Sequence, residues 1–127
     1  GEHGPLIQLW DCFDSPSQVF VFREGRIHWK THPSMCLSVV GQENKDGARL
    51  QIWECLDEGA PGHSQQVWQI PAATHSRLEG LIRWDDHPDK CMDVTEHALS
   101  NGNEMQLWTC WGGDSAQDML LEPLAMQ

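Results

Sequence analysis

Three copies of one short phrase decide the fold of this chain: Leu6-Ile7-Gln8-Leu9-Trp10-Asp11-Cys12, Arg49-Leu50-Gln51-Ile52-Trp53-Glu54-Cys55 and Glu104-Met105-Gln106-Leu107-Trp108-Thr109-Cys110. Each copy has the alternation of a strand, so Gln, Trp and Cys share one face while Leu or Ile points to the other. A glycine stands six positions before each Trp. Three copies with the same spacing between the glycine and the Trp indicate an internal repeat.

Between the copies lie short runs rich in Val, Ile, Leu and aromatic residues, separated by Gly, Pro, Asp, Asn and Ser, which is the pattern of strands and turns. The runs are 18–23, 26–30, 35–40, 66–71, 80–84, 90–94 and 117–123. No stretch has sustained helical periodicity. The sequence therefore predicts an all-β fold of three similar four-strand units around a pseudo-threefold axis.

Length and charge limit the classes of protein. The 127 residues fit one domain, and we expect it to span 1–127, with a partial unit one over 1–24, unit two over 25–78 and unit three over 79–127. The 8 basic residues against 19 acidic ones give a net charge of −11, which argues against nucleic acid as a partner because phosphate backbones need clustered cations. Without a long apolar run, membrane insertion is not expected.

Four of the five cysteines form two pairs with the same spacing. Cys36 and Cys55 are 19 positions apart, as are Cys91 and Cys110. If the strands that carry them pair antiparallel with these cysteines directly opposed, the pairs are at disulfide distance. The same register places Asp93 opposite Trp108. Each bridge should contribute about 3 kcal/mol in the chain-entropy model, and two bridges indicate an oxidising compartment, so we expect a secreted, extracellular or lumenal protein.

Cys12 is left without a partner in this sequence. The same spacing places its partner upstream of Gly1, and unit one has only its last two strands. We therefore expect the first hairpin of unit one to be missing from this sequence and present in the full protein or in a neighbouring chain. The alternative is a truncated unit with a free or intermolecular thiol.

The third unit carries the motifs of a known family. Cys91-Met92-Asp93-Val94, Asn101-Gly102-Asn103 and Gln106-Leu107-Trp108-Thr109-Cys110 follow one another at the spacing of the ricin B-chain lectin family, and the chain resembles that family throughout. Its closing Gln-x-Trp motif is kept as Gln66-Val67-Trp68 and weakened at 18–20 and 117–119. The resemblance implies a β-trefoil.

The resemblance also implies a site for a galactose-type sugar in unit three. Such a sugar needs a flat aromatic side chain beneath its apolar face and fixed polar groups at its edge. Trp108 would be the platform, Asp93 would accept hydrogen bonds from two hydroxyls, and Gln106 would orient the carboxylate. Gln117 or Asp118 would complete the rim, although this loop departs from the family pattern.

The other two units are expected to bind weakly or not at all. Ser38 stands where unit two needs the acid, although Gln51, Trp53 and Gln65 remain. In unit one Gln8 and Trp10 form half a site at most. The Trp side chains of these phrases have a structural interpretation too, since they can cover the disulfides.

Metal and catalytic sites are not expected. His28, His32 and Cys36 lie at intervals of four, but the segment reads as strand and turn, and the cysteine is better explained by its bridge than by zinc. The acidic residues at 85, 86 and 89 read as a solvated loop rather than as glycosidase carboxylates. We expect no cofactor and no enzyme activity.

The sequence thus predicts a lectin domain that binds a galactose or N-acetylgalactosamine-like sugar mainly through unit three, with glycans as its partners. Two alternatives stay open because fold does not fix function. One is a structural or protein-interaction module, without sugar binding, of a larger secreted or lumenal assembly. The other is a targeting appendage of an enzyme in a multidomain parent chain.

Overall fold

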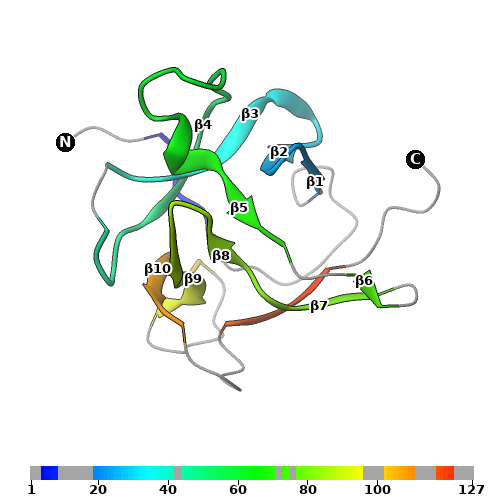
Figure 1. Cartoon of the computed structure of the whole chain (residues 1–127), viewed down its shortest axis with the longest axis vertical. Coiled ribbons are helices and arrows are strands. Elements are labelled where there is room, and N and C mark those ends of the chain that lie inside the picture. The colour runs from blue at the N-terminus through cyan, green and yellow to red at the C-terminus, as the bar shows by residue number, and fades with distance from the viewer. Residues whose placement is uncertain are drawn as a thin grey trace.

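The computed structural model (Figure 1) describes residues 4–8, 19–41, 44–70, 73–74, 77–95, 102–110 and 117–121. Its strands are β1 (Phe20–Arg23), β2 (Arg26–Trp29), β3 (His32–Val39), β4 (Leu50–Glu54), β5 (Trp68–Gln69), β6 (Ala73–Thr74), β7 (Arg77–Leu81), β8 (Arg83–Trp84), β9 (His87–Val94), β10 (Met105–Thr109) and β11 (Asp118–Leu121). A single turn of 3₁₀-helix, η2 (His63–Gln66), precedes β5. The described part of the chain contains no α-helix, so the prediction of an all-β fold is confirmed.

The strands form three antiparallel sheets. One has the order β1-β2-β3-β4, the second β10-β9-β8-β5 and the third β11-β7-β6. The hairpin between β1 and β2 turns through two residues, Glu24 and Gly25, which both have positive φ angles of 54° and 78°. A two-residue hairpin turn needs this conformation, and glycine adopts it without strain.

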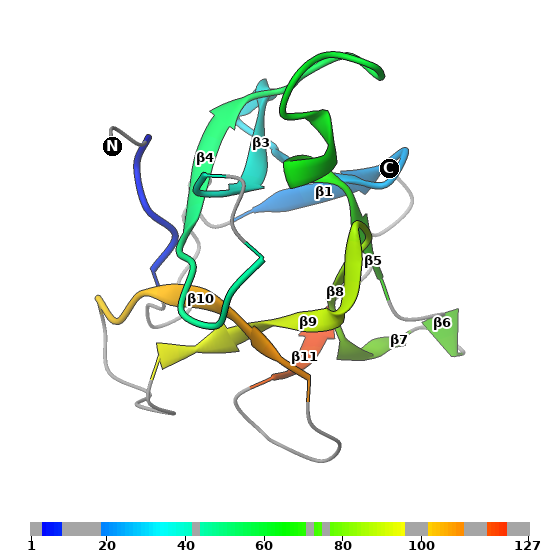
Figure 2. The same ribbon diagram turned by 60° about the vertical axis from the view of Figure 1, so that its left-hand side comes forward.

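The three phrases meet in a closed ring. Isolated bridges join Leu6 to Gln51, Arg49 to Gln106 and Glu104 to Gln8. Each bridge runs from the residue four before the Trp of one phrase to the residue two before the Trp of the next, so the contacts repeat with threefold symmetry. Figure 2 shows the N-terminal segment running beside β4 and towards β10. This ring is the pseudo-threefold arrangement that the repeat predicts. Trp10 and Cys12 lie outside the described residues, and the hairpin and partner cysteine expected upstream of Gly1 stay a prediction.

The approach of the first phrase to the second is close enough to require glycine. A Cβ atom on Gly4 would lie 2.3 Å from the backbone oxygen of Ile52. The Gly4 amide donates to Gln51 Oε1 over 2.6 Å, and the Ile52 amide donates to the Pro5 oxygen over 2.8 Å. A side chain at position 4 would therefore displace the segment from β4.

Units two and three carry the same long hairpin. In β3–β4 Cys36 pairs with Trp53, and in β9–β10 Cys91 pairs with Trp108 at the equivalent positions, 55 residues further on. Both predicted disulfides are present, Cys36–Cys55 and Cys91–Cys110, with Cα separations of 5.0 and 5.1 Å.

The predicted register of these hairpins is wrong by two residues. Cys110 lies across from Asp89, to whose oxygen its amide donates over 2.8 Å, and the residue across from Asp93 is Gln106 instead of Trp108. Each disulfide therefore joins diagonal neighbours, which the twist of a hairpin brings within bridging distance. A shift of two residues preserves the faces, so Asp93 and Trp108 still share one.

The inward face of both hairpins builds the core. Its buried apolar side chains are Ile27, Leu37, Val39, Leu50, Ile52, Trp68, Ile82, Trp84, Met92, Val94, Met105 and Leu107. Ile70 is only partly buried and packs against this core. Because alternate residues face inward, the Gln and Trp positions of β4 and β10 face away from the core.

Candidate functional site

The outward face of β9–β10 holds a buried carboxylate and its hydrogen-bond partner. Asp93 on β9 is 2% exposed, and Gln106 lies directly across from it on β10. The Gln106 Nε2 atom donates to Asp93 Oδ2 over 2.8 Å. The partly buried Trp108 follows Gln106 by two residues and therefore lies on the same face. The structure thus brings three of the predicted site residues together and fixes the orientation of the carboxylate.

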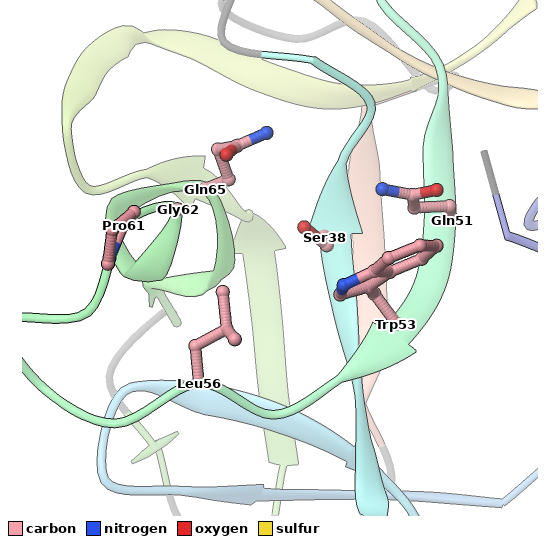
Figure 3. A pocket seen from close by; sticks show the side chains of 7 residues that line it. All are labelled: Ser38, Gln51, Trp53, Leu56, Pro61, Gly62 and Gln65. Carbon is pink, nitrogen blue, oxygen red and sulfur yellow. The ribbon is translucent and has the colours of Figure 1, made fainter. Parts of the chain in front are cut away.

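The equivalent face of β3–β4 opens into a pocket of about 230 Å³ lined by Ser38, Gln51, Trp53, Leu56, Pro61, Gly62 and Gln65. In Figure 3 Gln51 and Trp53 stand on β4, Ser38 lies on β3, and Pro61, Gly62 and Gln65 approach from the side of η2. Trp53 is 44% exposed. The pocket therefore has an aromatic wall and polar groups, but a hydroxyl stands where unit three has its carboxylate.

Low exposure does not exclude a residue from such a pocket. Ser38 is 3% exposed and still lines the hollow of unit two. Asp93 occupies the same register position in unit three, across from Gln106 as Ser38 is across from Gln51. A residue at this position can thus be covered from solvent and still form part of the pocket wall.

The glutamines of the closing Gln-x-Trp motifs, Gln66 and Gln117, donate hydrogen bonds to backbone oxygens at the ends of β4 and β10. Gln66 is fully buried, accepts from the Leu56 amide over 2.9 Å and donates to the Glu54 oxygen over 2.8 Å. Gln117 is also fully buried and donates from Nε2 to the Thr109 oxygen over 3.0 Å. Since Glu54 and Thr109 both follow the Trp of their phrase, the two glutamines have equivalent contacts. Gln117 is thus held within the protein rather than at a solvent-facing rim, and the side chain of Asp118 lies outside the described part.

Asp46 links units two and three next to the candidate site. Its carboxylate accepts from Lys90 Nζ over 2.9 Å, from the Thr109 amide over 2.6 Å and from the Thr109 hydroxyl over 2.9 Å. Burial tends to raise the pKa of this carboxyl, but the hydrogen bonds from Lys90 and Thr109 outweigh burial, and the pKa is lowered. Asp46 therefore holds the end of β10, directly after Trp108, in place.

The structure brings together only part of the set His28, His32 and Cys36, whose spacing of four was not expected to form a metal site. His32 stacks on Trp29, with ring centroids 4.6 Å apart. His28 instead packs on the Cys36–Cys55 bridge, with Nδ1 3.7 Å from Cys36 Sγ and 3.5 Å from Cys55 Sγ. In the disulfide form these sulfurs offer no thiolate, so the donor set does not fit a resident metal ion.

Three residues that line the pocket were not predicted from the sequence. Leu56, Pro61 and Gly62 lie in or beside residues 58–63, which fall between the second phrase and the run 66–71, where the repeat predicts no strand. Gly62 has a φ angle of 90° and directly precedes η2, so the chain turns back over the β3–β4 face there. The available signal was the density of Gly and Pro at 59–62.

Comparison with solved structures supports the fold. The designed threefold-symmetric protein ThreeFoil shares 18% identity and superposes with a TM-score of 0.72 over 96% of this chain and 84% of that one. The C-half of the earthworm R-type lectin, solved in complex with GalNAc, shares 15% identity with a TM-score of 0.66 over 94% of this chain and 82% of its own. A mosquitocidal holotoxin shares 14% identity with a TM-score of 0.67, over 97% of this chain but 15% of its own.

Comparison at the level of sequence identifies the family. No curated protein matches the chain significantly. Residues 1–118 match the ricin-type beta-trefoil lectin domain, and the predicted β-trefoil is confirmed by that match together with the structural neighbours. The chain belongs to the family of ricin-type β-trefoil lectin domains.

Proposed function

We propose that this domain binds a galactose or N-acetylgalactosamine-like sugar through the outward face of β9–β10. The observation that carries the proposal is the buried hydrogen bond of 2.8 Å between Gln106 Nε2 and Asp93 Oδ2. A buried carboxylate is costly unless it is hydrogen-bonded, and the bond from Gln106 holds this one in a fixed orientation on the face that also carries Trp108, which favours a binding role. Family membership and the earthworm neighbour crystallised with GalNAc support the same choice.

In this proposal each residue has a distinct task. Trp108 stacks against the apolar C–H face of the sugar. Asp93 accepts hydrogen bonds from hydroxyls of the sugar, because an ionised carboxylate is a strong acceptor. Gln106 positions the carboxylate, and Gln117 supports the strand after Trp108 from within the protein. Asp118 stays the candidate for the rim.

The test compares the two equivalent tryptophans. A single shallow site of this kind binds on the order of millimolar, or about 4 kcal/mol, so binding is measured by NMR titration with galactose and N-acetylgalactosamine. We expect Trp108→Ala to lose binding while the matched control Trp53→Ala keeps it, with both variants folded by circular dichroism. Full binding by Trp108→Ala would refute the proposed site.

A gain-of-function variant tests the role of the acid. Ser38→Asp places a carboxylate across from Gln51, beside the existing pocket and Trp53. We expect a second, weak binding event in calorimetry, whereas Ser38→Asn should give none because it lacks the charge. Equal behaviour of the two variants would contradict the importance of the carboxylate.

A protein-interaction module is the second candidate function. Trp53 is exposed beside a pocket without an acidic group, and partly exposed aromatic side chains are enriched at protein interfaces. A glycan array without hits, together with a protein that co-purifies and is lost in Trp53→Ala, would select it. The two disulfides are typical of oxidising compartments, so we propose a secreted or lumenal setting for either function, with catalysis outside this domain.

A further inference from the structure

A nitrogen atom that can bind a metal, His28 Nδ1, lies beside the two sulfurs of the Cys36–Cys55 bridge. His28 Nδ1, Cys36 Sγ and Cys55 Sγ all lie within 4.8 Å of one another. A tetrahedral zinc ion with bonds of about 2.3 Å to sulfur and about 2.0 Å to nitrogen places sulfur and nitrogen about 3.5 Å apart. The observed distances from Nδ1 to the two sulfurs, 3.5 and 3.7 Å, have this length.

We propose that opening the Cys36–Cys55 disulfide converts this cluster into a zinc site, with ligands His28 Nδ1 and the two cysteine sulfurs and with water in the fourth position. The disulfide and the metal exclude each other because the same two sulfurs form both. The inference concerns the reduced chain and does not depend on the proposed sugar binding.

The chemistry of the conversion balances. A reductant, in solution a water-soluble phosphine, donates two electrons to the S–S bond and is oxidised to the phosphine oxide with the oxygen of one water molecule. The two protons of that water complete the thiols, and zinc binding then releases both protons as the thiolates become ligands. In a cell a dithiol reductant would play the same part and end as its own disulfide.

The imidazole can present the required lone pair. At present Nδ1 lies 2.8 Å from the Pro33 oxygen, and since a carbonyl only accepts, Nδ1 carries the hydrogen. Nε2 is buried and has no hydrogen-bond partner in the described part of the chain. The neutral ring can therefore move its hydrogen to Nε2 and turn the Nδ1 lone pair to the metal, giving up the bond to Pro33.

The third unit provides an internal control. Arg83 occupies the position of His28, since both pair with the first cysteine of their hairpin, Cys91 or Cys36. Arg83 donates to the Pro88 oxygen over 3.0 Å, as His28 does to the equivalent Pro33 oxygen. The arginine performs the structural task but cannot ligate zinc, so the Cys91–Cys110 pair lacks the nitrogen ligand.

The experiment measures metal binding by the reduced chain. All variants carry Cys12→Ser to remove the extra thiol, and the bridges are opened with phosphine. Cobalt(II) reports the site through its visible bands and its thiolate charge-transfer band, and zinc competition gives the affinity. We expect one ion per chain with two thiolate ligands, and none at this site in the oxidised chain.

Two substitutions decide the assignment. His28→Arg copies the third unit and keeps a donor for Pro33, and it should weaken binding at least about a hundredfold, because loss of even an outer partner of a ligand costs about 10–100-fold. Arg83→His should add a second ion of the same spectrum. Equal binding by His28→Arg and the parent chain would overturn the proposal.

The folded state of the reduced chain is followed by near-ultraviolet circular dichroism. If reduction unfolds the domain, stoichiometric zinc should restore the tryptophan signal in the parent chain and fail to do so in His28→Arg. A reduced chain that stays unfolded in zinc would also overturn the proposal.

Discussion

At the scale of single residues, equivalent positions of the two long hairpins separate structure from function. Leu50 and Ile52 on β4 are buried, and so are their equivalents on β10, Met105 and Leu107. The glutamine two positions before each Trp is present in both hairpins. The difference lies in Ser38 against Asp93 and in His28 against Arg83. The residues that build the repeat are thus shared, while those with distinctive chemistry are specific to one unit.

Asp46 gives a pH-dependent prediction at this scale. Its pKa is lowered in the folded protein, so the folded state resists protonation more than the unfolded chain, whose Asp has a pKa of about 3.9. Its stabilising contribution is complete above that value and is lost as the pH falls through the lower, folded pKa. Asp46→Asn should therefore unfold at lower urea concentration than the parent near pH 6, and the difference should shrink towards pH 3. A difference that is constant with pH would show that the charge is irrelevant.

At the scale of elements, the buried side chain of Gln66 hydrogen-bonds to backbone groups at the end of β4, where strand pairing stops. Gln66 ends η2 and hydrogen-bonds to the oxygen of Glu54, the last residue of β4, and to the amide of Leu56 just after it. Such groups must find partners when the chain leaves a sheet within the protein interior. The 3₁₀ turn is thus positioned over the pocket by a polar contact from its buried end.

We predict that Gln66→Ala destabilises the domain by about 2–4 kcal/mol, because it removes a fully buried side chain and leaves a part-buried amide and a part-buried carbonyl without that partner. The matched control is Gln69→Ala on β5, whose exposed side chain donates to Asp85 Oδ1 over 3.0 Å and whose removal should cost less than about 1 kcal/mol. Urea unfolding measures both, and similar losses would argue against the bracing role.

The sequence predicted elements better than their edges. The three phrases predicted the strands β4 and β10 and the faces of their side chains. The run 80–84 is divided between β7 and β8, since Ile82 turns into the core, and β9 begins at His87 rather than at position 90. Alternation determines which face of the sheet a residue occupies, but a shift of the pairing by two residues leaves every face unchanged. The alternation therefore could not reveal that the cysteines are diagonal rather than directly opposed.

The site was predictable to the extent that it lies on those strands. Asp93 and Gln106 follow from alternation within one hairpin. The burial of Gln117 does not, because a polar residue in a loop gives no sign of whether it faces solvent or a backbone group. Likewise the contact of His28 with Cys55 joins residues 27 positions apart and depends on the tertiary fold.

At the scale of the whole molecule, the three units share one core. The buried apolar side chains of both long hairpins form a single cluster with Trp68 and Trp84. Because removal of a buried leucine side chain leaves a cavity that the surroundings fill only in part, it costs about 2–5 kcal/mol.

We predict that Leu50→Ala and Leu107→Ala each lower the free energy of unfolding by this amount and leave the dependence on urea concentration unchanged. Phe22→Ala, at a side chain that is 46% exposed, is the control with little effect. Two separate unfolding transitions in either leucine variant would contradict a single cooperative core.

The ring of bridges has a consequence for how such a protein can diverge. Each phrase forms one bridge with the next phrase and one with the previous phrase. None of the three copies therefore lies at an open end of the ring, and none needs a different sequence to close it. Most of the hydrogen bonds between phrases join backbone atoms, and the Gln51 side chain adds a bond to the Gly4 amide. A substitution on the outward face of one unit can therefore change the chemistry of that face without breaking the ring, as the contrast between Asp93 in unit three and Ser38 at the equivalent position of unit two illustrates.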